Sequence, residues 1–450
     1  MTQTYDQKNE ALKRLLEQLS QGDKEYWSFR GNATREYSHA YSQYPAMMVP
    51  QMQAKLLQSI RSVEPDFNSV YDPYMGSGTI QTEAMKLGMD FTGGDINPLA
   101  VLLCRAKAGP FHVDELCDSS DALLLRVLRD RGTSVDVNFK GIKKWFRDDV
   151  LVELSRIRRA ILGEGDQWLR RFYWIALSET VRLSSNSRTS TFKLHTRPVE
   201  EIRERTVSPI TVFCDQVRQN REQFRAQTGL LAENGLLKNG VYQGAVNIHL
   251  ADACDPMLAA EHEHQHDGLA TSPPYGDNVT TVPYGQYSFL QLQWIDHADI
   301  DEDMDAGYLA TTHEIDRRSL GGSRKNALKD MERLNDTSPS FKATIEALED
   351  KPKDRSARVA AFCRDFDRSL DPILTTLKPG AVMVWTVGNR KVGGLPVPID
   401  DILSELLVER GAKEIIQLQR KIPNKRMAVK NGTTETMRAE TILVLRKGGM

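Results

Sequence analysis

The sequence lacks several features that would assign it to a common class. No apolar run approaches the roughly 20 residues that a membrane helix needs, and the polar start has no signal-peptide core. The five cysteines are scattered without a C-x-x-C pair, which indicates neither a disulfide framework nor a cysteine zinc site. The net charge of -2 identifies no partner, because a nucleic-acid enzyme can confine its positive charge to one face. We therefore expect a cytoplasmic protein with reduced thiols and no membrane contact.

The chain does have a regular alternation of short apolar runs and helical patterns. A strand, a glycine loop and a helix follow one another in SVYDPYMGSGTIQTEAMKLG, and MDFTGGDINPLA begins a second such unit. This alternation is typical of a parallel, doubly wound sheet. Further strands are expected in GAVNIHLADA, DGLATSPPY, AVMVWTVGN, AKEIIQLQR and AETILVLRK. The sequence therefore predicts an α/β protein.

The loop DPYMGSGT has the character of a ligand-binding turn. Gly76 and Gly78 permit backbone angles and a close approach that side chains would block, and the following helix presents free N–H groups. The loop matches neither G-x-x-x-x-G-K-[ST] nor G-x-G-x-x-G. Asp95, at the end of the next strand, can accept both hydroxyls of a ribose. Together they indicate a nucleoside-bearing cofactor without a pyrophosphate; a structural turn and a helix-capping aspartate are the alternative.

The stretch TSPPYGDN places two rigid prolines at a strand end. The exocyclic amine of a base is a poor nucleophile because its lone pair is delocalised into the ring. The Ser272 hydroxyl and the Pro273 carbonyl can accept its hydrogens, and the prolines hold these acceptors in place before the substrate arrives. Tyr275 offers a face on which an extruded base can stack. The alternative is a rigid turn without chemistry.

Together, DPYMGSGT, GGDINPLA and TSPPY resemble the motifs of S-adenosylmethionine-dependent amino-methyltransferases of DNA, especially the N4-cytosine group with its S-P-P-Y signature. YPAMMVPQM resembles the family segment that closes over the methionine end of the cofactor. The resemblance covers about 40–108, 245–295 and 375–447. It implies a Rossmann-like methyltransferase fold with a mostly parallel seven-stranded sheet and a helical insertion.

The resemblance also implies roles for the residues at matching positions. The catalytic residues would be Ser272, Pro273, Pro274 and Tyr275. S-adenosylmethionine would be bound by Tyr44, Pro45, Asp72, Gly76, Gly78, Thr79, Asp95, Asp252 and Ala253. A loop cap is the alternative role for Asp252.

The implied reaction is site-specific methylation of cytosine N4 in double-stranded DNA, in a restriction-modification or related host-marking system. A cognate restriction endonuclease would then be a second partner. N6-adenine methylation stays open because the same acceptors serve either amine. N2-guanine methylation of RNA stays open because its enzymes share a similar glycine loop. A DNA-binding protein with a degenerate methyltransferase fold is the non-enzymatic alternative. Neither the recognition sequence nor the oligomeric state is indicated.

Two inserted stretches divide the expected catalytic domain. We predict N-terminal helices and the first part of the catalytic domain over 1–110, and a helical insertion suited to DNA recognition over 111–240. The catalytic domain continues over 241–294, a polar insertion covers 295–360, and the C-terminal part of the domain covers 361–450.

Two basic stretches are candidates for contacts with the DNA backbone. The chain from 182 to 225 has more basic than acidic residues, interleaved with small polar ones in SSNSRTSTFKLH; a solvated helical face is the alternative. RKIPNKRMAVKNG, expected as a loop between the last two strands, contains no acid. The acidic DHADIDEDMD should face away from DNA. The predicted DNA contacts are Arg188, Lys193, Arg197, Lys421, Lys425 and Arg426.

Alternating histidines in EHEHQHD are the candidate metal ligands. His262, His264 and His266 lie in a short connection without cysteines or a second pair of ligands. We predict a solvated loop and no metal site. Tyr284 and Tyr287, downstream, are expected to pack against the sheet rather than to line a base pocket.

Overall fold

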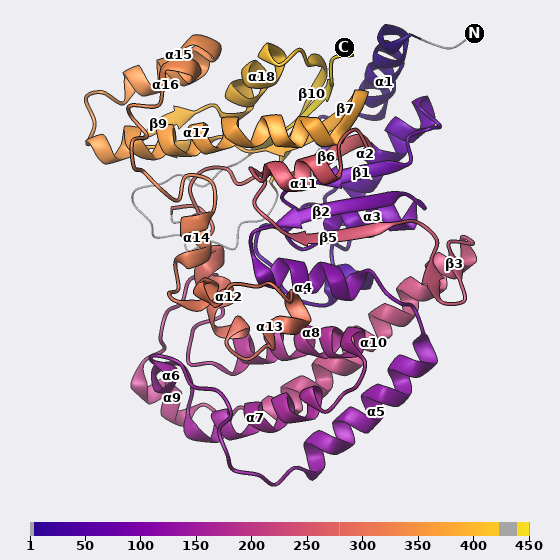
Figure 1. The fold of residues 1–450 in the computed structure, drawn as a ribbon, viewed down its shortest axis with the longest axis vertical. Coiled ribbons are helices and arrows are strands. Elements are labelled where there is room, and N and C mark those ends of the chain that lie inside the picture. Colours follow the sequence, from indigo (N-terminus) through magenta and orange to yellow (C-terminus); the bar gives the residue numbers. More distant parts are fainter. Residues whose placement is uncertain (1–3, 279, 423–438, 450) are drawn as a thin grey trace.

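One seven-stranded sheet organises the computed structural model, which describes residues 4–278, 280–422 and 439–449 (Figure 1). The strand order is β10-β11-β7-β6-β1-β2-β5, with β11 antiparallel to both of its neighbours and the other pairs parallel. The strands are β1 (Ser69–Asp72), β2 (Asp90–Asp95), β5 (Val246–Leu250), β6 (His266–Thr271), β7 (Leu377–Val387), β10 (Lys413–Lys421) and β11 (Ala439–Arg446). The prediction of a Rossmann-like methyltransferase fold with a mostly parallel sheet is confirmed.

Strand order reverses at β1, which positions the site. The chain proceeds from β1 to β2 and β5 on one side, and then crosses back to place β6 on the other side of β1. In open α/β sheets, ligands bind in the crevice beyond the carboxyl ends of the strands at such a reversal. Here those ends are Asp72, Asp95 and Thr271.

Alternate residues of the central strands pack into two separate cores. Val70 and Val384 belong to one core and Tyr71 and Trp385 to the other, as the two-residue period of a strand requires. Each large apolar side chain buried in this way contributes about 1.5–3 kcal/mol to folding. The sheet is therefore covered on both faces, which explains why its strands are apolar throughout.

Helices of the first half cover one face of the sheet. They are α1 (Tyr5–Leu19), α2 (Pro50–Val63), α3 (Thr79–Lys86) and α4 (Pro98–Lys107), with short turns η1 (Tyr26–Ser28) and η2 (Tyr37–Ala40). The opposite face is covered mainly by α17 (Lys353–Thr376) and α18 (Ile399–Glu409), while α11 (Pro256–Glu261) packs on α17. None of the helices in the described part of the chain is long and apolar enough to cross a membrane.

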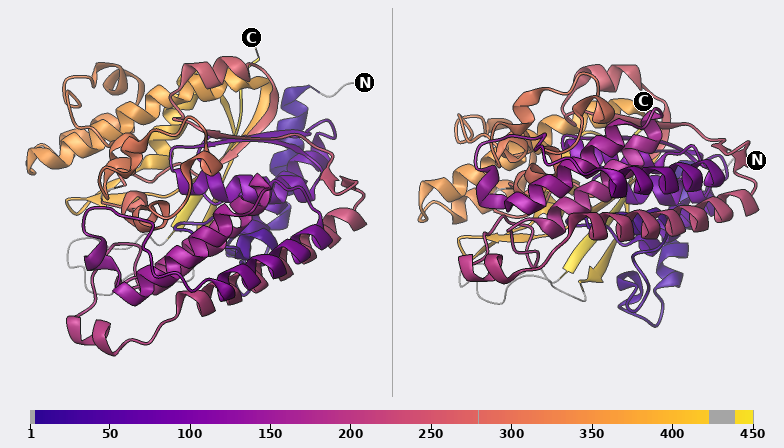
Figure 2. Two further views of the ribbon diagram at one scale, coloured as in Figure 1. Left: turned by 60° about the horizontal axis from the view of Figure 1, so that its bottom comes forward. Right: turned by 90° about the horizontal axis from the view of Figure 1, so that it is seen from below.

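A helical layer lies beyond α4, away from the sheet (Figures 1 and 2). Its helices are α5 (Val113–Arg129), α6 (Ile142–Trp145), α7 (Asp148–Leu162), α8 (Gln167–Ser184), α9 (Val199–Glu204) and α10 (Pro209–Glu233). The hairpin β3 (Leu237–Lys238) and β4 (Val241–Tyr242) returns the chain to β5. Because α8 packs on α4, this layer extends the core of the first face.

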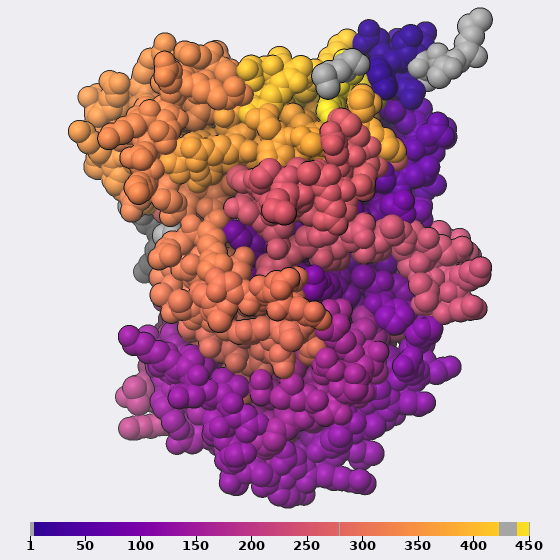
Figure 3. Space-filling view, in the orientation of Figure 1, coloured from indigo at the N-terminus to yellow at the C-terminus, as the bar shows by residue number. Residues whose placement is uncertain are grey.

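The first part of the segment between β6 and β7 packs on this layer, through contacts of α12 (Tyr284–Leu292) and α13 (His297–Ile300) with α8. The short turn η3 (Ala306–Leu309) and α14 (Glu314–Arg318) follow. The later helices α15 (Glu332–Thr337) and α16 (Pro339–Ala347) pack on α17 and α18 instead. Asp299 accepts hydrogen bonds from Arg170 and from the Trp174 indole at 2.7 Å each, and Figure 3 shows the orange segment resting against the purple layer. One aspartate of the acidic run is therefore buried in an internal ion pair.

Two sequence-based predictions are wrong. His262 and His266 are buried, because the His262 ring bonds His249 at 3.1 Å and His266 stacks on Tyr71 at 5.3 Å between centroids. Burial lowers the pKa of His266 to about 4. The stretch RKIPNKRMAVKNG does not lie wholly between strands either, since β10 extends through Lys421.

Candidate active site

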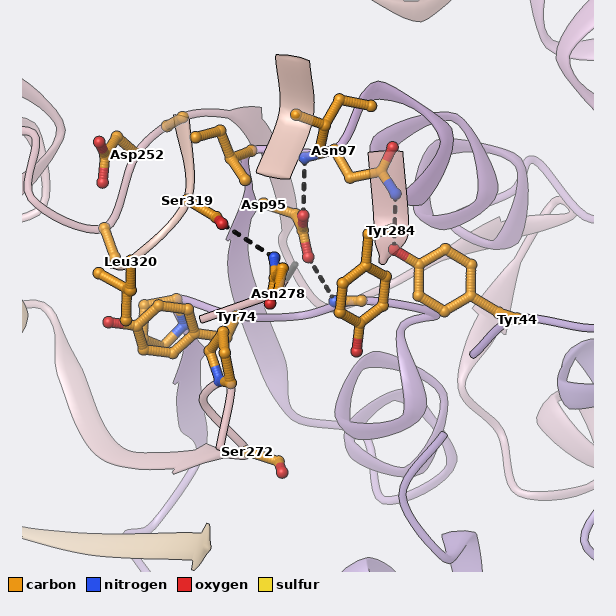
Figure 4. Close-up of a pocket in the computed structure, with 17 residues that line it drawn as sticks. Tyr44, Tyr74, Asp95, Asn97, Asp252, Ser272, Asn278, Tyr284, Ser319 and Leu320 are labelled. Atoms are coloured by element: carbon orange, nitrogen blue, oxygen red, sulfur yellow. Dashed lines mark hydrogen bonds between the residues drawn. The ribbon is translucent and has the colours of Figure 1, made fainter. Parts of the chain in front are cut away.

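A partly open pocket lies at the reversal point of the sheet, where ligands of open α/β sheets bind. Figure 4 shows Asp95 near its middle, with Asp252 on one side, Tyr44 and Tyr284 on the other, and Ser272 below. Ser272 is the first residue of the predicted catalytic loop, 272–278, which follows β6. The lining residues are Tyr44, Pro73, Tyr74, Gly76, Asp95, Ile96, Asn97, Ala251, Asp252, Ala253, Ser272, Pro274, Asn278, Tyr284, Ile315, Ser319 and Leu320.

Asp95 is held in one orientation by backbone donors. Its carboxylate accepts hydrogen bonds from the N–H groups of Gly76 at 2.8 Å and Asn97 at 2.7 Å. The Asn97 amide in turn donates to the hydroxyls of Tyr44 and Ser288, both at 2.9 Å. Burial raises the pKa of Asp95 to about 6, while the carboxylate still faces the pocket. Both oxygens keep free lone pairs, so the group can accept the hydroxyls of a ribose.

The glycine loop is supported from beneath by buried side chains. Gly78 has φ +71, and a Cβ there would lie 2.8 Å from the Cys104 sulfur. The Lys107 ammonium donates to the Ser77 carbonyl at 2.6 Å, and burial lowers its pKa to about 8. The loop is thus fixed before a ligand arrives, and only glycine fits at Gly78.

Asp72 lies behind the pocket wall rather than in it. It is fully buried and accepts hydrogen bonds from the Thr271 hydroxyl at 2.6 Å and from the Tyr74 N–H at 3.2 Å. Burial raises the pKa of Asp72 to about 7, and its second oxygen has no hydrogen-bond donor among the described residues. Because Thr271 precedes Ser272, this bond couples the glycine loop to the catalytic loop.

The catalytic loop is tied to the two C-terminal strands by a chain of polar contacts. The Ser272 and Tyr275 hydroxyls are 3.0 Å apart, and the Tyr275 hydroxyl donates to Glu440 on β11 at 3.1 Å. Glu440 forms an ion pair of 2.9 Å with Arg420 on β10. Burial and the neighbouring carboxylate raise the pKa of Tyr275 well above its usual value. The Tyr275 hydroxyl therefore keeps its proton.

The residues that follow the tyrosine lock the end of the loop. Gly276 has φ +136, a backbone conformation that other residues rarely adopt, and a Cβ there would lie 1.8 Å from the Arg390 guanidinium. Arg390 of the hairpin β8 (Arg390–Val392) and β9 (Leu395–Val397) pairs with buried Asp277 at 3.2 Å. The Asn278 amide donates to the Ser319 hydroxyl at 2.9 Å, and its carbonyl oxygen, which has no donor among the described residues, lies on a residue of the pocket wall.

The pocket brings together about half of the predicted site residues. Those that line it are Tyr44, Gly76, Asp95, Asp252, Ala253, Ser272 and Pro274. Those that do not line it are Pro45, Asp72, Gly78, Thr79, Pro273 and Tyr275. Asp252 also caps its own loop, because its carboxylate accepts the Cys254 N–H at 2.9 Å.

Sequence reasoning missed lining residues from outside the recognised motifs. Ile315, Ser319 and Leu320 come from the segment predicted as a polar insertion, and no motif identified them. Tyr284 lines the pocket as well as packing against Tyr44, with 5.8 Å between ring centroids. Asn97, in contrast, stands two residues after Asp95 in GGDINPLA and could have been inferred as the N-cap of α4.

The predicted DNA contacts fall into three groups. Arg188 and Lys193 lie on a hairpin closed by the Ser187–Thr196 bridge, and neither forms an ion pair with another described residue. Arg197 and Lys421 are paired with glutamates, Glu201 and Glu25 respectively. Lys425 and Arg426 lie outside the described residues.

The hairpin that carries Arg188 and Lys193 stands beside the pocket. The Leu194 N–H donates to Gln286 at 3.2 Å, and the Phe192 ring packs edge-on against Tyr287 at 5.7 Å between centroids. Both partners belong to α12, the helix that also places Tyr284 in the pocket. The hairpin therefore packs against a helix that also lines the pocket.

The pocket suits S-adenosylmethionine. A carboxylate for the ribose, a glycine cradle, aromatic walls and an unpartnered amide oxygen match a nucleoside joined to a charged amino acid.

Comparison with known proteins identifies the chain. No protein-family model matches it. The Type II methyltransferase M.MvaI of Kocuria varians is 32% identical over 461 residues, which cover 97% of this chain and 98% of that protein. The structure of the rRNA methyltransferase aviRa from Streptomyces viridochromogenes matches across 90% of this chain and 86% of the aviRa chain, at 13% identity. Its TM-score of 0.27 is too low to indicate a shared fold. The chain belongs to the type II methyltransferases, enzymes that use S-adenosylmethionine as the methyl donor.

Proposed function

We propose that this protein transfers a methyl group from S-adenosylmethionine to the N4 amine of a cytosine extruded from double-stranded DNA. The observation that carries the proposal is that Ser272 and Asp95 line one pocket. A nucleoside cofactor held at Asp95 then lies within the same cavity as an acceptor for an amine hydrogen. The Ser-Pro-Pro-Tyr order favours cytosine over adenine through the resemblance of this motif to the N4-cytosine group.

The roles of the residues follow from this geometry. The bound cofactor supplies an electrophilic methyl group on a sulfonium. Asp95 accepts the ribose hydroxyls, and Asp252 keeps one carboxylate oxygen for the adenine amino group. Ser272 accepts a hydrogen of the target amine, which concentrates the lone pair on nitrogen, and holds it in line with the methyl group. The Pro273 carbonyl as a second acceptor and the Tyr275 ring as a stacking face complete the proposed site.

Binding of DNA is proposed at the hairpin that carries Arg188 and Lys193. Neither cation forms an ion pair within the described part of the chain, so both are proposed to meet phosphates, unlike Arg197. A role in cytoplasmic host marking, with a cognate restriction endonuclease, is the biological setting that we propose from the relative's name.

Product identification tests the proposal. The protein is incubated with labelled S-adenosylmethionine and DNA, the DNA is digested to nucleosides, and the labelled nucleoside is identified. We expect N4-methylcytosine. Recovery of N6-methyladenine, or of label only in RNA, would contradict the proposed target.

A further inference from the structure

We propose that Glu440 is the terminal acceptor of the proton that leaves the target amine, and that Ser272 and Tyr275 conduct this proton to it. The inference deepens the proposed function and rests on it, because it takes Ser272 as the group that meets the amine. Glu440 belongs to no motif that the sequence made recognisable, and Arg420 was singled out only as the first residue of the basic stretch RKIPNKRMAVKNG.

The contacts fix the direction of the hydroxyl hydrogens. An ionised carboxylate can only accept hydrogen bonds, so Glu440 accepts from the Tyr275 hydroxyl across 3.1 Å. The Tyr275 oxygen is then free to accept from the Ser272 hydroxyl across 3.0 Å. The Ser272 oxygen consequently turns its lone pairs toward the pocket, which it lines. Without an anion at the end of the chain, Ser272 could equally point its hydrogen at the amine and repel it.

Arg420 stabilises the negative charge of the Glu440 carboxylate beside the loop. The side chains of Arg420 and Glu440 are only 7% and 15% exposed, and their ion pair is 2.9 Å long. A carboxylate with so little water around it needs a cation beside it, and a guanidinium remains protonated at all working pH values. The ion pair spans the edge of the sheet between β10 and β11, so these two strands reach the catalytic loop through it.

Protons and electrons balance along this route. The nitrogen lone pair forms the new N–C bond while the sulfur takes the electron pair of the broken S–C bond and becomes a neutral thioether. The N–H pair returns to nitrogen as its proton passes to the Ser272 oxygen. The Ser272 proton moves to Tyr275, and the Tyr275 proton moves to Glu440, which becomes a neutral carboxyl. One positive and one negative charge are cancelled, and both hydroxyls are restored. Glu440 is thus a positioning residue that acts on the amine through two hydroxyls.

Single-turnover methyl transfer in the full-length protein, with saturating S-adenosylmethionine and DNA, tests the inference. Glu440→Gln should slow transfer by about 100-fold, in the range of a lost general base, while the Kd values for cofactor and DNA stay within about twofold. Tyr275→Phe keeps the ring but removes the relaying hydroxyl, and it should show a similar loss. The double variant should be no slower than the slower single one, because the two groups serve one route.

Glu414→Gln is the matched control, since it neutralises an exposed glutamate on β10 whose partners are Ser404 and Gln417. It should leave the rate within about twofold. If Glu440→Gln disturbs folding by leaving Arg420 unpaired, Tyr275→Phe alone decides the matter, because it preserves the ring.

Three results would overturn the inference: a wild-type rate in Glu440→Gln, a wild-type rate in Tyr275→Phe, or losses that multiply in the double variant. Ser272→Ala separates this failure from failure of the proposed function. An inactive Ser272→Ala beside an active Glu440→Gln removes the relay and leaves the proposed function standing. A fully active Ser272→Ala variant would contradict both the proton relay and the proposed function.

Discussion

The two halves of the pocket are built in different ways. On the cofactor half, Asp95 is positioned by the backbone of Gly76 and Asn97, within about one strand–helix unit of the chain. On the target half, Ser272 is positioned through Tyr275 by Glu440, which is contributed by the last strand of the sheet. The first half is local and rigid before binding, whereas the second depends on the whole sheet being assembled. Variants of the two halves should therefore separate cofactor affinity from the rate of chemistry.

The largest effect is expected from Ser272→Ala. Loss of the hydroxyl removes the acceptor of the amine hydrogen, so single-turnover transfer should fall by about 10²–10⁴-fold. The Kd for S-adenosylmethionine, measured by calorimetry, should stay within about twofold, because no bond of Asp95 involves Ser272. Ser323→Ala, at an exposed serine, is the control. A large loss of cofactor affinity in Ser272→Ala would show that the two halves are not separable.

Asp95→Ala should produce the converse result. Removal of the carboxylate would delete the two charge-assisted hydrogen bonds that we propose to the ribose, and the cofactor Kd should rise by about 100-fold. Because burial raises the pKa of Asp95 to about 6, the carboxyl gains a proton as the pH falls through that value. Wild-type affinity should therefore decrease by about tenfold between about pH 8 and about pH 5. Asp95→Asn should bind weakly with little dependence on pH, and a parallel pH dependence in that variant would contradict the assignment.

Asp72→Asn tests the residue that links the cofactor half of the pocket to the target half through its hydrogen bond with Thr271. With a folded-state pKa raised to about 7, Asp72 holds its proton more tightly in the folded protein than in the unfolded chain. Ionisation as the pH rises above the unfolded value therefore costs stability, and the cost is complete above about pH 7. An amide keeps the bonds from Thr271 and Tyr74 without the charge.

We expect the Asp72→Asn variant to be more stable by about 2 kcal/mol at about pH 8, and by much less at about pH 5. Denaturant unfolding at both pH values measures the difference. Asp66→Asn, at an exposed aspartate outside the pocket, should change neither. Equal effects of Asp72→Asn at the two pH values would show that charge is not the cause.

Sequence reasoning predicted the sheet and the contiguous motifs well for physical reasons. A buried parallel strand is apolar throughout, and a glycine turn followed by an acidic strand end leaves a local signature, so Gly76 and Asp95 were identified. Ser319 and Glu440 left no such signature, because their roles arise from contacts over 41 and 165 positions. The histidine run was misjudged because alternating polar letters do not reveal that His266 starts a buried strand.

The smallest effects concern DNA and extend the comparison to the surface. Arg188 and Lys193 have no ion-pair partner in the described part of the chain, whereas Arg197 on the same hairpin is paired with Glu201. A free cation that meets a phosphate releases about 0.9 counterion, so Arg188→Ala and Lys193→Ala should each raise the Kd for DNA by about three- to tenfold. Each should also reduce the slope of log Kd against log salt concentration by about one.

Arg197→Ala is the matched control on the same hairpin, and its neutralisation should leave the slope nearly unchanged because Glu201 already balances the charge. Fluorescence anisotropy over a salt series measures all three variants. Equal slopes in Arg188→Ala and wild type would remove the hairpin from the DNA interface, and cofactor affinity should not change in any variant because the hairpin has no residue in contact with Asp95.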